Sequence, residues 1–170
     1  MNGSNNKIAL FAGLSSFLAV FENFIPIPVP FLRIGISNIP VSLGFVLFNF
    51  KELLFIVLFK TIFSHLFRGT LFSYVFLIAL SGNLLFIFIT FPFYQIFKKR
   101  ISFISLGLIG AISHNLGQIF ASLIFLPAKS ALLIGYFIIS IGLIFGFANG
   151  YICNIVYRKF FTRALYGQVV

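Results

Sequence analysis

Apolar residues along the chain form long uninterrupted blocks, and polar residues gather mainly between them. Five of these blocks, residues 8–25, 52–68, 71–92, 101–126 and 131–157, are 17 to 27 residues long, and a sixth, residues 36–50, is shorter. A membrane-spanning helix needs about 20 apolar residues to cross a hydrocarbon layer about 30 Å thick. The pattern therefore predicts an all-α fold, a polytopic membrane helix bundle that forms one integral membrane domain over residues 1–170.

The segment between the first two blocks has a different character. It carries four of the six prolines of the chain, Pro26, Pro28, Pro30 and Pro40. Proline at alternate positions removes backbone donors and favours extended backbone. We therefore expect a structured loop and not a helix between residues 26 and 40.

Composition supports the membrane prediction. Apolar residues make up 61% of the chain and charged residues only 8%, whereas soluble proteins contain about 45–50% and 25%. The net charge of +10 does not indicate nucleic-acid binding, because the cations lie mostly at the ends of apolar blocks. This distribution is typical of a multi-pass protein of the cytoplasmic (inner) membrane, whose cytoplasmic loops are rich in Lys and Arg.

Charge counting leaves the number of spans open between five and six. With six spans both termini are cytoplasmic and three cations lie outside, namely Arg33, Arg68 and Lys129. Eight then lie inside: Lys7, Lys51, Lys98, Lys99, Arg100, Arg158, Lys159 and Arg163. Without the 36–50 span, Arg33 and Lys7 exchange sides and the split stays the same. The positive-inside bias therefore cannot decide this span.

The chain lacks the residues that most catalytic sites require. It has two acids, Glu22 and Glu52, no Asp, and one cysteine, Cys153. Carboxylate-built magnesium sites, Cys-rich zinc sites and Asp-containing triads are thereby excluded. The sequence also has no P-loop, HExxH or GxSxG motif. We expect a protein that is not an enzyme and that binds no metal and no cofactor. At most it is the non-catalytic partner of an enzyme.

One predicted helix carries polar residues on a single face. Lys60, Thr61, Ser64, His65 and Arg68 recur at helical spacing. Polar residues in a bilayer are costly and usually face protein or water. This face is either the wall of a pocket for an anionic or polar ligand, or a packing face whose cations extend to the two interfaces.

A second polar group lies in the 101–126 block. His114, Asn115 and Gln118 lie on or beside a face of small residues that includes Gly107, Gly110 and Gly117. Small residues at this spacing predict a close helix–helix contact. The three polar side chains line a pocket or form hydrogen bonds between helices.

Small residues also mark the first and the last block. Gly142, Gly146 and Gly150 predict helix packing in the last block. In the first block, Ala9, Ala12, Gly13 and Ser16 indicate either internal packing or docking onto another membrane subunit.

Glu22 is the acid best placed to act inside the membrane. It comes just before the proline segment, where it could neutralise Arg33 or the Lys60 face, or bind a substrate or a proton. Glu52 instead fits a solvated helix start, where the helix dipole favours a negative charge.

Two blocks together resemble a known family. The first block consists of two stretches, Glu22-Asn23-Phe24-Ile25-Pro26 and the segment from Arg33 to Ile39, which includes Asn38. The second block runs from Gly110 to Gln118 and reads G-A-I-S-H-N-L-G-Q. They resemble the Gx transporter family, whose members are often labelled heptaprenyl diphosphate synthase component I. That family is similar to the S components of energy-coupling-factor transporters.

The resemblance implies a fold and a set of roles. It implies six helices, cytoplasmic termini, the proline loop as a lid over the ligand, and the small residues of the first helix as a docking surface for a transmembrane coupling subunit. The chain would capture a small polar or anionic molecule for import powered by separate ATPases. The residues that it would use are drawn from Glu22, Arg33, Asn38, Lys60, His65, Arg68, His114, Asn115 and Gln118.

The family label suggests a second function. The chain could be a non-catalytic membrane component associated with a heptaprenyl diphosphate synthase, in isoprenoid or quinone metabolism. It lacks the Asp residues that a prenyl-transfer metal site would use. A self-contained secondary carrier is disfavoured because the sequence shows no inverted repeat.

Overall fold

The structure is a computed structural model that describes residues 3–25 and 34–162. All the regular elements in these two ranges are helical, which confirms the all-α prediction. The six α-helices are α1 (Gly3–Phe21), α2 (Asn38–Gly44), α3 (Phe50–Phe67), α4 (Tyr74–Phe97), α5 (Phe103–Phe125) and α6 (Ala128–Val156).

Four helices in the described part of the chain are long and apolar enough to cross a membrane. They correspond to residues 5–24, 74–97, 103–125 and 128–160. Helix α3 is 18 residues long but contains Lys51, Glu52 and Lys60. The fold is thus an apolar bundle suited to a membrane, whereas six spans and cytoplasmic termini stay a prediction.

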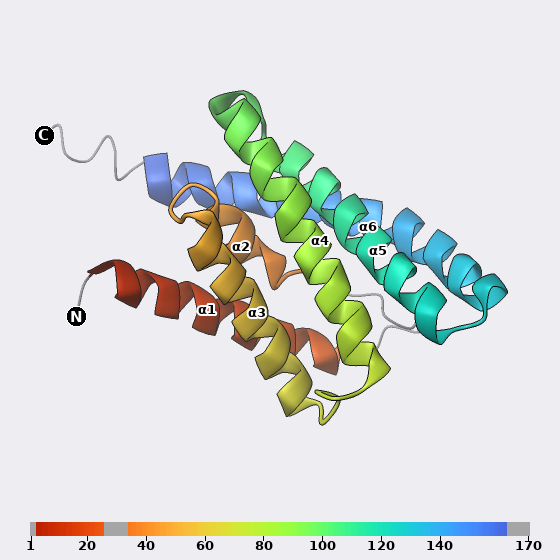
Figure 1. The fold of residues 1–170 in the computed structure, drawn as a ribbon. Helices are drawn as coiled ribbons and strands as arrows, with labels where there is room; N and C mark the ends of the chain where they lie inside the picture. The colour runs from red at the N-terminus through yellow and green to blue at the C-terminus, as the bar shows by residue number, and fades with distance from the viewer. Residues whose placement is uncertain (1–2, 26–33, 163–170) are drawn as a thin grey trace, which may run out of the picture.

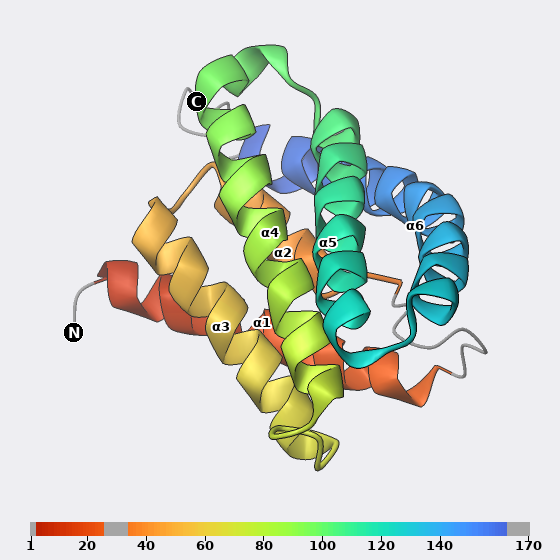
Figure 2. The same cartoon turned by 45° about the vertical axis from the view of Figure 1, so that its right-hand side comes forward.

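The helices form an arc that the short helix α2 closes. Along this arc α1 packs on α3, α3 on α4, α4 on α5 and α5 on α6. Figures 1 and 2 show α4 and α5 side by side, with α2 enclosed by the longer helices. Helix α2 contacts both ends of the arc, α1 and α6.

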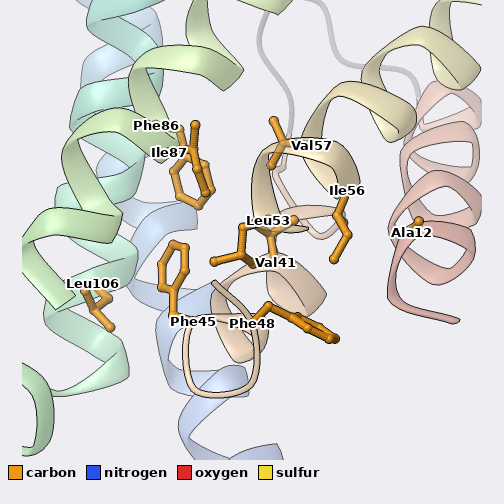
Figure 3. Packing of buried hydrophobic residues seen from close by; sticks show 10 residues of the cluster. All are labelled: Ala12, Val41, Phe45, Phe48, Leu53, Ile56, Val57, Phe86, Ile87 and Leu106. Carbon is orange, nitrogen blue, oxygen red and sulfur yellow. The ribbon is translucent and has the colours of Figure 1, made fainter. Parts of the chain in front are cut away.

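An apolar core holds α2 in this central position. Val41 and Phe45 meet Leu53 and Val57 of α3 and Phe86 of α4 (Figure 3). Residues Pro40 to Phe45 are all buried. Burial of this apolar surface fixes the polar residues around α2 in the middle of the bundle.

The helix predicted over residues 36–50 is much shorter in the structure. Helix α2 has seven residues, about 10 Å of helix, and turns follow it up to Phe48, whose backbone N donates to Gly44 O at 2.9 Å. The apolar sequence of residues 36–50 contains no signal that predicts this break. Irregular backbone at membrane depth is tolerated where protein surrounds it, and here the neighbouring helices do so.

Helix α4 extends beyond its predicted end at residue 92. It includes Pro92 and continues to Phe97. Proline inside a helix removes one backbone hydrogen bond and clashes with the preceding turn. Helices in membranes tolerate proline because neighbouring groups satisfy the freed carbonyl.

Close glycine contacts bring α5 against both α4 and α6. A Cβ atom added at Gly150 would lie 2.5 Å from Phe103 O, and one added at Gly117 would lie 2.7 Å from Ser81 O. Gly107 and Gly146 face one another across α5 and α6, and Gly110 faces the Phe86 ring. These glycines allow backbones to approach where a side chain would separate them.

Candidate functional site

A polar cavity lies inside the bundle, and all six helices contribute to it. Its free volume of about 60 Å³ is room for several water molecules, since one water needs about 10–15 Å³ by the same measure. The polar side chains around it are Glu22, Ser37, Asn38, Ser42, Lys60, Thr61, Asn83, His114, Asn115, Gln118 and Asn149. We refer to it as the central cavity.

Lys60 brings a buried cation to the central cavity from the middle of α3. Its side chain is only 2% exposed, and its Nζ donates a hydrogen bond to Asn38 Oδ1 at the start of α2. The contact fixes the amide and the ammonium group side by side. A buried ammonium is costly unless polar groups surround it, and the cavity supplies them.

Glu22 brings a buried carboxylate from the end of α1. It is 6% exposed and accepts hydrogen bonds from the Ser37 backbone N at 3.0 Å and from Ser37 Oγ at 3.5 Å. Among the described residues, the cavity is thus lined by one cation and one carboxylate, both contacting Ser37 or Asn38 where α2 begins.

The amide and hydroxyl groups between α3 and α4 form a short chain. Asn83 Nδ2 donates to Thr61 Oγ1 at 2.9 Å, and Thr61 Oγ1 donates to Val57 O at 2.7 Å. Both side chains are buried. This chain orients the Asn83 amide at the cavity wall beside Lys60.

Helix α5 contributes the remaining predicted polar group. Asn115 Nδ2 donates to Ile138 O of α6 at 3.0 Å and lies against Gly142. His114 and Gln118 lie against Gly82 of α4. All three polar side chains line the cavity, so Asn115 both joins two helices and faces the polar space.

Residues Ile34 to Asn38 close the cavity through contacts with three helices. Glu22, directly after α1, and Lys60 of α3 hold Ser37 and Asn38, as described above, while Asn149 Nδ2 of α6 donates to Ile34 O at 2.7 Å. Gly35 has a φ of +81°, a conformation that glycine adopts easily. We call residues 34–38 the closing segment.

The structure places the predicted site residues in three groups. Six line the central cavity: Glu22, Asn38, Lys60, His114, Asn115 and Gln118. His65 and Arg68 are not among the described residues that line it: His65 is buried with Nδ1 2.9 Å from Thr61 O, and Arg68 is exposed at the end of α3. Arg33 and the prolines at 26, 28 and 30 lie outside the described residues.

Sequence reasoning missed several polar residues of the cavity. Ser37, Ser42, Asn83 and Asn149 line it, and none was among the predicted binding residues. Asn83 could have been found, because a lone amide in the middle of an apolar helix usually faces protein. The signal for Ser37 and Ser42 is weak, since a serine fits equally well in a helix–helix contact.

The small residues of α1 divide between two surfaces. Ala12 and Ser16 are buried, and Ser16 Oγ donates to Ala12 O at 2.7 Å. Ala9 and Gly13 are exposed, together with apolar side chains such as Leu10 and Phe17. Of the four residues predicted for docking, only Ala9 and Gly13 are therefore accessible to a partner.

This arrangement is suited to binding. A cation, a carboxylate, five amides and an imidazole line one space within an apolar bundle. Few precisely placed polar groups in a largely apolar surrounding are typical of small-molecule sites.

Comparison with known proteins identifies the family. The family model described as heptaprenyl diphosphate synthase component I matches residues 11–156. No curated protein and no solved structure matches the chain. The matched range includes the closing segment and the cavity residues of all six helices. The chain belongs to the heptaprenyl diphosphate synthase component I family.

Proposed function

We propose that the protein is a membrane subunit that captures a small polar or anionic molecule in the central cavity for import. The observation that carries the proposal is the burial of Lys60 and Glu22 in one cavity lined with amides. Buried ionisable residues inside a membrane bundle are costly and usually mark a pathway or a ligand site. The resemblance of the sequence to the Gx transporter family, which is similar to transporter S components, supports the same function.

The closing segment provides a means of capture. In the structure Lys60, Glu22 and Asn149 bind Asn38, Ser37 and Ile34, and the cavity has space for only a few waters. A substrate that replaced the closing segment would keep Lys60, Glu22 and Asn149 hydrogen-bonded. Substrate entry is thus an exchange of hydrogen bonds together with an outward movement of residues 34–38.

Energy for import comes from other subunits in this proposal. The chain contains no P-loop motif, so ATP hydrolysis belongs to separate ATPases, linked through a transmembrane coupling subunit. The exposed small residues Ala9 and Gly13 of α1 are the docking contact. The protein itself performs no covalent chemistry.

The proposal includes six crossings with both termini in the cytoplasm. Helices α1, α4, α5 and α6 supply four of them. Helix α3 is the fifth, because its charged residues Lys51 and Glu52 lie at its start and Lys60 faces the cavity. The closing segment and α2 form the sixth, inside the bundle.

The test is to measure what the purified protein retains. We expect a small molecule to be released on denaturation of wild-type protein purified in mild detergent, and to be detected by mass spectrometry. A Lys60→Gln variant should retain at least about tenfold less, because a charge-assisted hydrogen bond is lost. Lys129→Gln, which alters an exposed cation outside the cavity, should retain the wild-type amount.

Two results would contradict capture. One is wild-type protein that releases no small molecule above the amount in a mock preparation. The other is equal retention by the Lys60→Gln and wild-type proteins at equal yield. Co-purification of an ATPase pair would support import.

The family description favours a second candidate. A protein of this family could be a non-catalytic membrane component that holds a heptaprenyl diphosphate synthase at the bilayer. Recovery of a soluble prenyl synthase with the purified chain, together with no retained small molecule, would support this alternative over import.

A further inference from the structure

A second cavity lies at the end of the bundle where α4 ends, α5 begins and α6 ends. Its volume is about 270 Å³. In Figure 1 this end of the bundle carries the turn between α4 and α5, near the last residues of α6. It lies beyond Gly107 and Gly150, which line the central cavity, and nothing in the proposed import function uses it. We call it the terminal cavity.

The terminal cavity is positively charged. Lys98 and Arg158 both line it, one from the end of α4 and one from the end of α6. Neither of the two acids of the chain is among the described residues that line it: Glu22 binds Ser37, and Glu52 caps α3. Two cations beside one cavity, without a carboxylate, attract an anion.

Hydrogen-bond donors accompany the two cations. Tyr94, Tyr157, Ser102 and Asn154 also line the cavity. Ser102 Oγ accepts from Ser105 N at 3.0 Å and so caps the start of α5; because Ser102 and Phe103 line the cavity, the positive end of the α5 dipole lies beside it. The donors and the dipole favour a ligand with several acceptor oxygens.

The backbone of Lys98 is held in an unfavourable conformation. Its φ is +41° and its ψ is −116°, a combination that residues with a Cβ rarely adopt. Such strain persists where the surrounding structure imposes it and often marks functional sites. Here it orients the chain as α4 ends, at the residue that brings a cation to the cavity.

Part of the wall of the terminal cavity is apolar. Val46, Phe103 and Leu106 line it, and the Phe103 ring lies 5.0 Å from the Tyr157 ring. A ligand that fills the cavity therefore has both an anionic head and an apolar part. A free inorganic anion would contact only the polar residues and would leave the apolar residues of the lining without a partner.

We propose that the terminal cavity binds the phosphate or diphosphate head of an amphiphilic molecule. Lys98 and Arg158 neutralise the oxygens, with Arg158 able to offer two parallel N–H donors. The apolar wall receives the first part of the hydrocarbon chain. Membrane phospholipids and prenyl diphosphates share this chemistry.

Native mass spectrometry of the full-length protein in detergent micelles tests the site. The probes are phosphatidylglycerol, phosphatidylcholine and inorganic pyrophosphate. We expect wild-type protein to bind phosphatidylglycerol in preference to phosphatidylcholine. The K98Q/R158Q double variant should bind phosphatidylglycerol at least about tenfold more weakly, because two charge-assisted contacts are lost. The matched control is K159Q, which removes the adjacent exposed cation, does not alter the lining, and should bind as wild type does.

Pyrophosphate distinguishes the two sources. Displacement of bound phosphatidylglycerol by pyrophosphate would indicate a site that binds a diphosphate head. Retention of the lipid would indicate a site for a membrane phospholipid. The proposal is overturned if the double variant binds as well as wild type, if K159Q loses as much binding, or if phosphatidylcholine binds equally well. If the double variant does not purify as a monodisperse protein, K98Q, R158Q and Y157F are compared with wild type in its place for phosphatidylglycerol binding. Y157F keeps the ring and removes one donor.

Discussion

At the scale of single residues, the main feature is a pair of opposite charges buried in one apolar bundle. Lys60 and Glu22 are nearly inaccessible and line the same cavity. Transfer of each charge out of water is costly, and burial of such a pair seldom stabilises a protein compared with apolar residues of similar size. The pair is therefore better explained by binding than by stability, which supports the proposed capture of a polar substrate.

Substitution of the pair tests whether the two charges depend on each other. Lys60→Met alone should lower the free energy of unfolding by about 3–5 kcal/mol, because it removes a buried cation from the cavity that also holds the Glu22 carboxylate. Glu22→Gln alone should also destabilise the protein. The double variant should lose less than the sum of the two, and thermal unfolding in one detergent would measure all three.

Strict additivity would contradict this coupling. The matched control pairs Glu22→Gln with Lys129→Gln, an exposed position far along the sequence. Those two changes should add, because Lys129 is exposed and is not among the described residues that line the cavity.

At the scale of elements, the α5–α6 contact depends on the absence of side chains. A Cβ at Gly146 would lie 2.6 Å from Ala111 Cβ and 2.8 Å from Gly107 O. Both neighbours are backbone or directly attached to it, so neither can move aside without separating the helices. Asn115 also depends on this contact, because its amide crosses to Ile138 over Gly142.

Gly146→Ala should therefore destabilise the bundle. Overpacking at a close helix contact costs about 1–3 kcal/mol, and thermal unfolding in detergent would show the loss as a lower Tm. Gly13→Ala is the matched control, since nothing in the described part of the chain lies within 4 Å of its added Cβ. A Tm of the Gly146→Ala protein equal to that of the control would show that α5 and α6 are not held by this contact.

The start of α3 shows what a sequence can specify at this scale. Asn49 Oδ1 accepts from Glu52 N at 3.0 Å, and Glu52 Oε2 accepts from Asn49 N at 2.9 Å. This capping box is local and can be read from Asn49 and Glu52 alone. The break after Gly44 has no such local signal, because the surrounding helices impose it. That is why the apolar run at 36–50 was mistaken for one helix.

At the scale of the whole molecule, the cavity could be predicted in part. Lys60, His114 and Gln118 were found because polar residues are rare enough in an apolar sequence to be conspicuous. His65 follows the same helical spacing as Lys60, yet it bonds within its own helix. Which side of a helix faces the cavity depends on how helices rotate against one another, and the spacing within one helix does not contain that information.

The orientation of the chain in the membrane is testable because the protein carries one cysteine. Cys153 is buried, so an impermeant maleimide should give little background. New cysteines at Asn5, Phe72, Arg100 and Lys129, all exposed, report on four ends of the helices. With six crossings we expect Phe72→Cys and Lys129→Cys to react in intact cells, and Asn5→Cys and Arg100→Cys to react only after permeabilisation.

Asn5 decides the number of crossings, since Arg100 and Lys129 are expected on the same sides with five or six. If the closing segment and α2 did not cross, Asn5→Cys would react from outside together with Lys129→Cys. The expected result, Asn5 on the same side as Arg100, requires a crossing whose regular part is only seven residues long. Such a crossing is stable only inside other helices, and it places the groups that bind Lys60 and Glu22 at membrane depth. The same arrangement that hides α2 from lipid would then create the polar cavity.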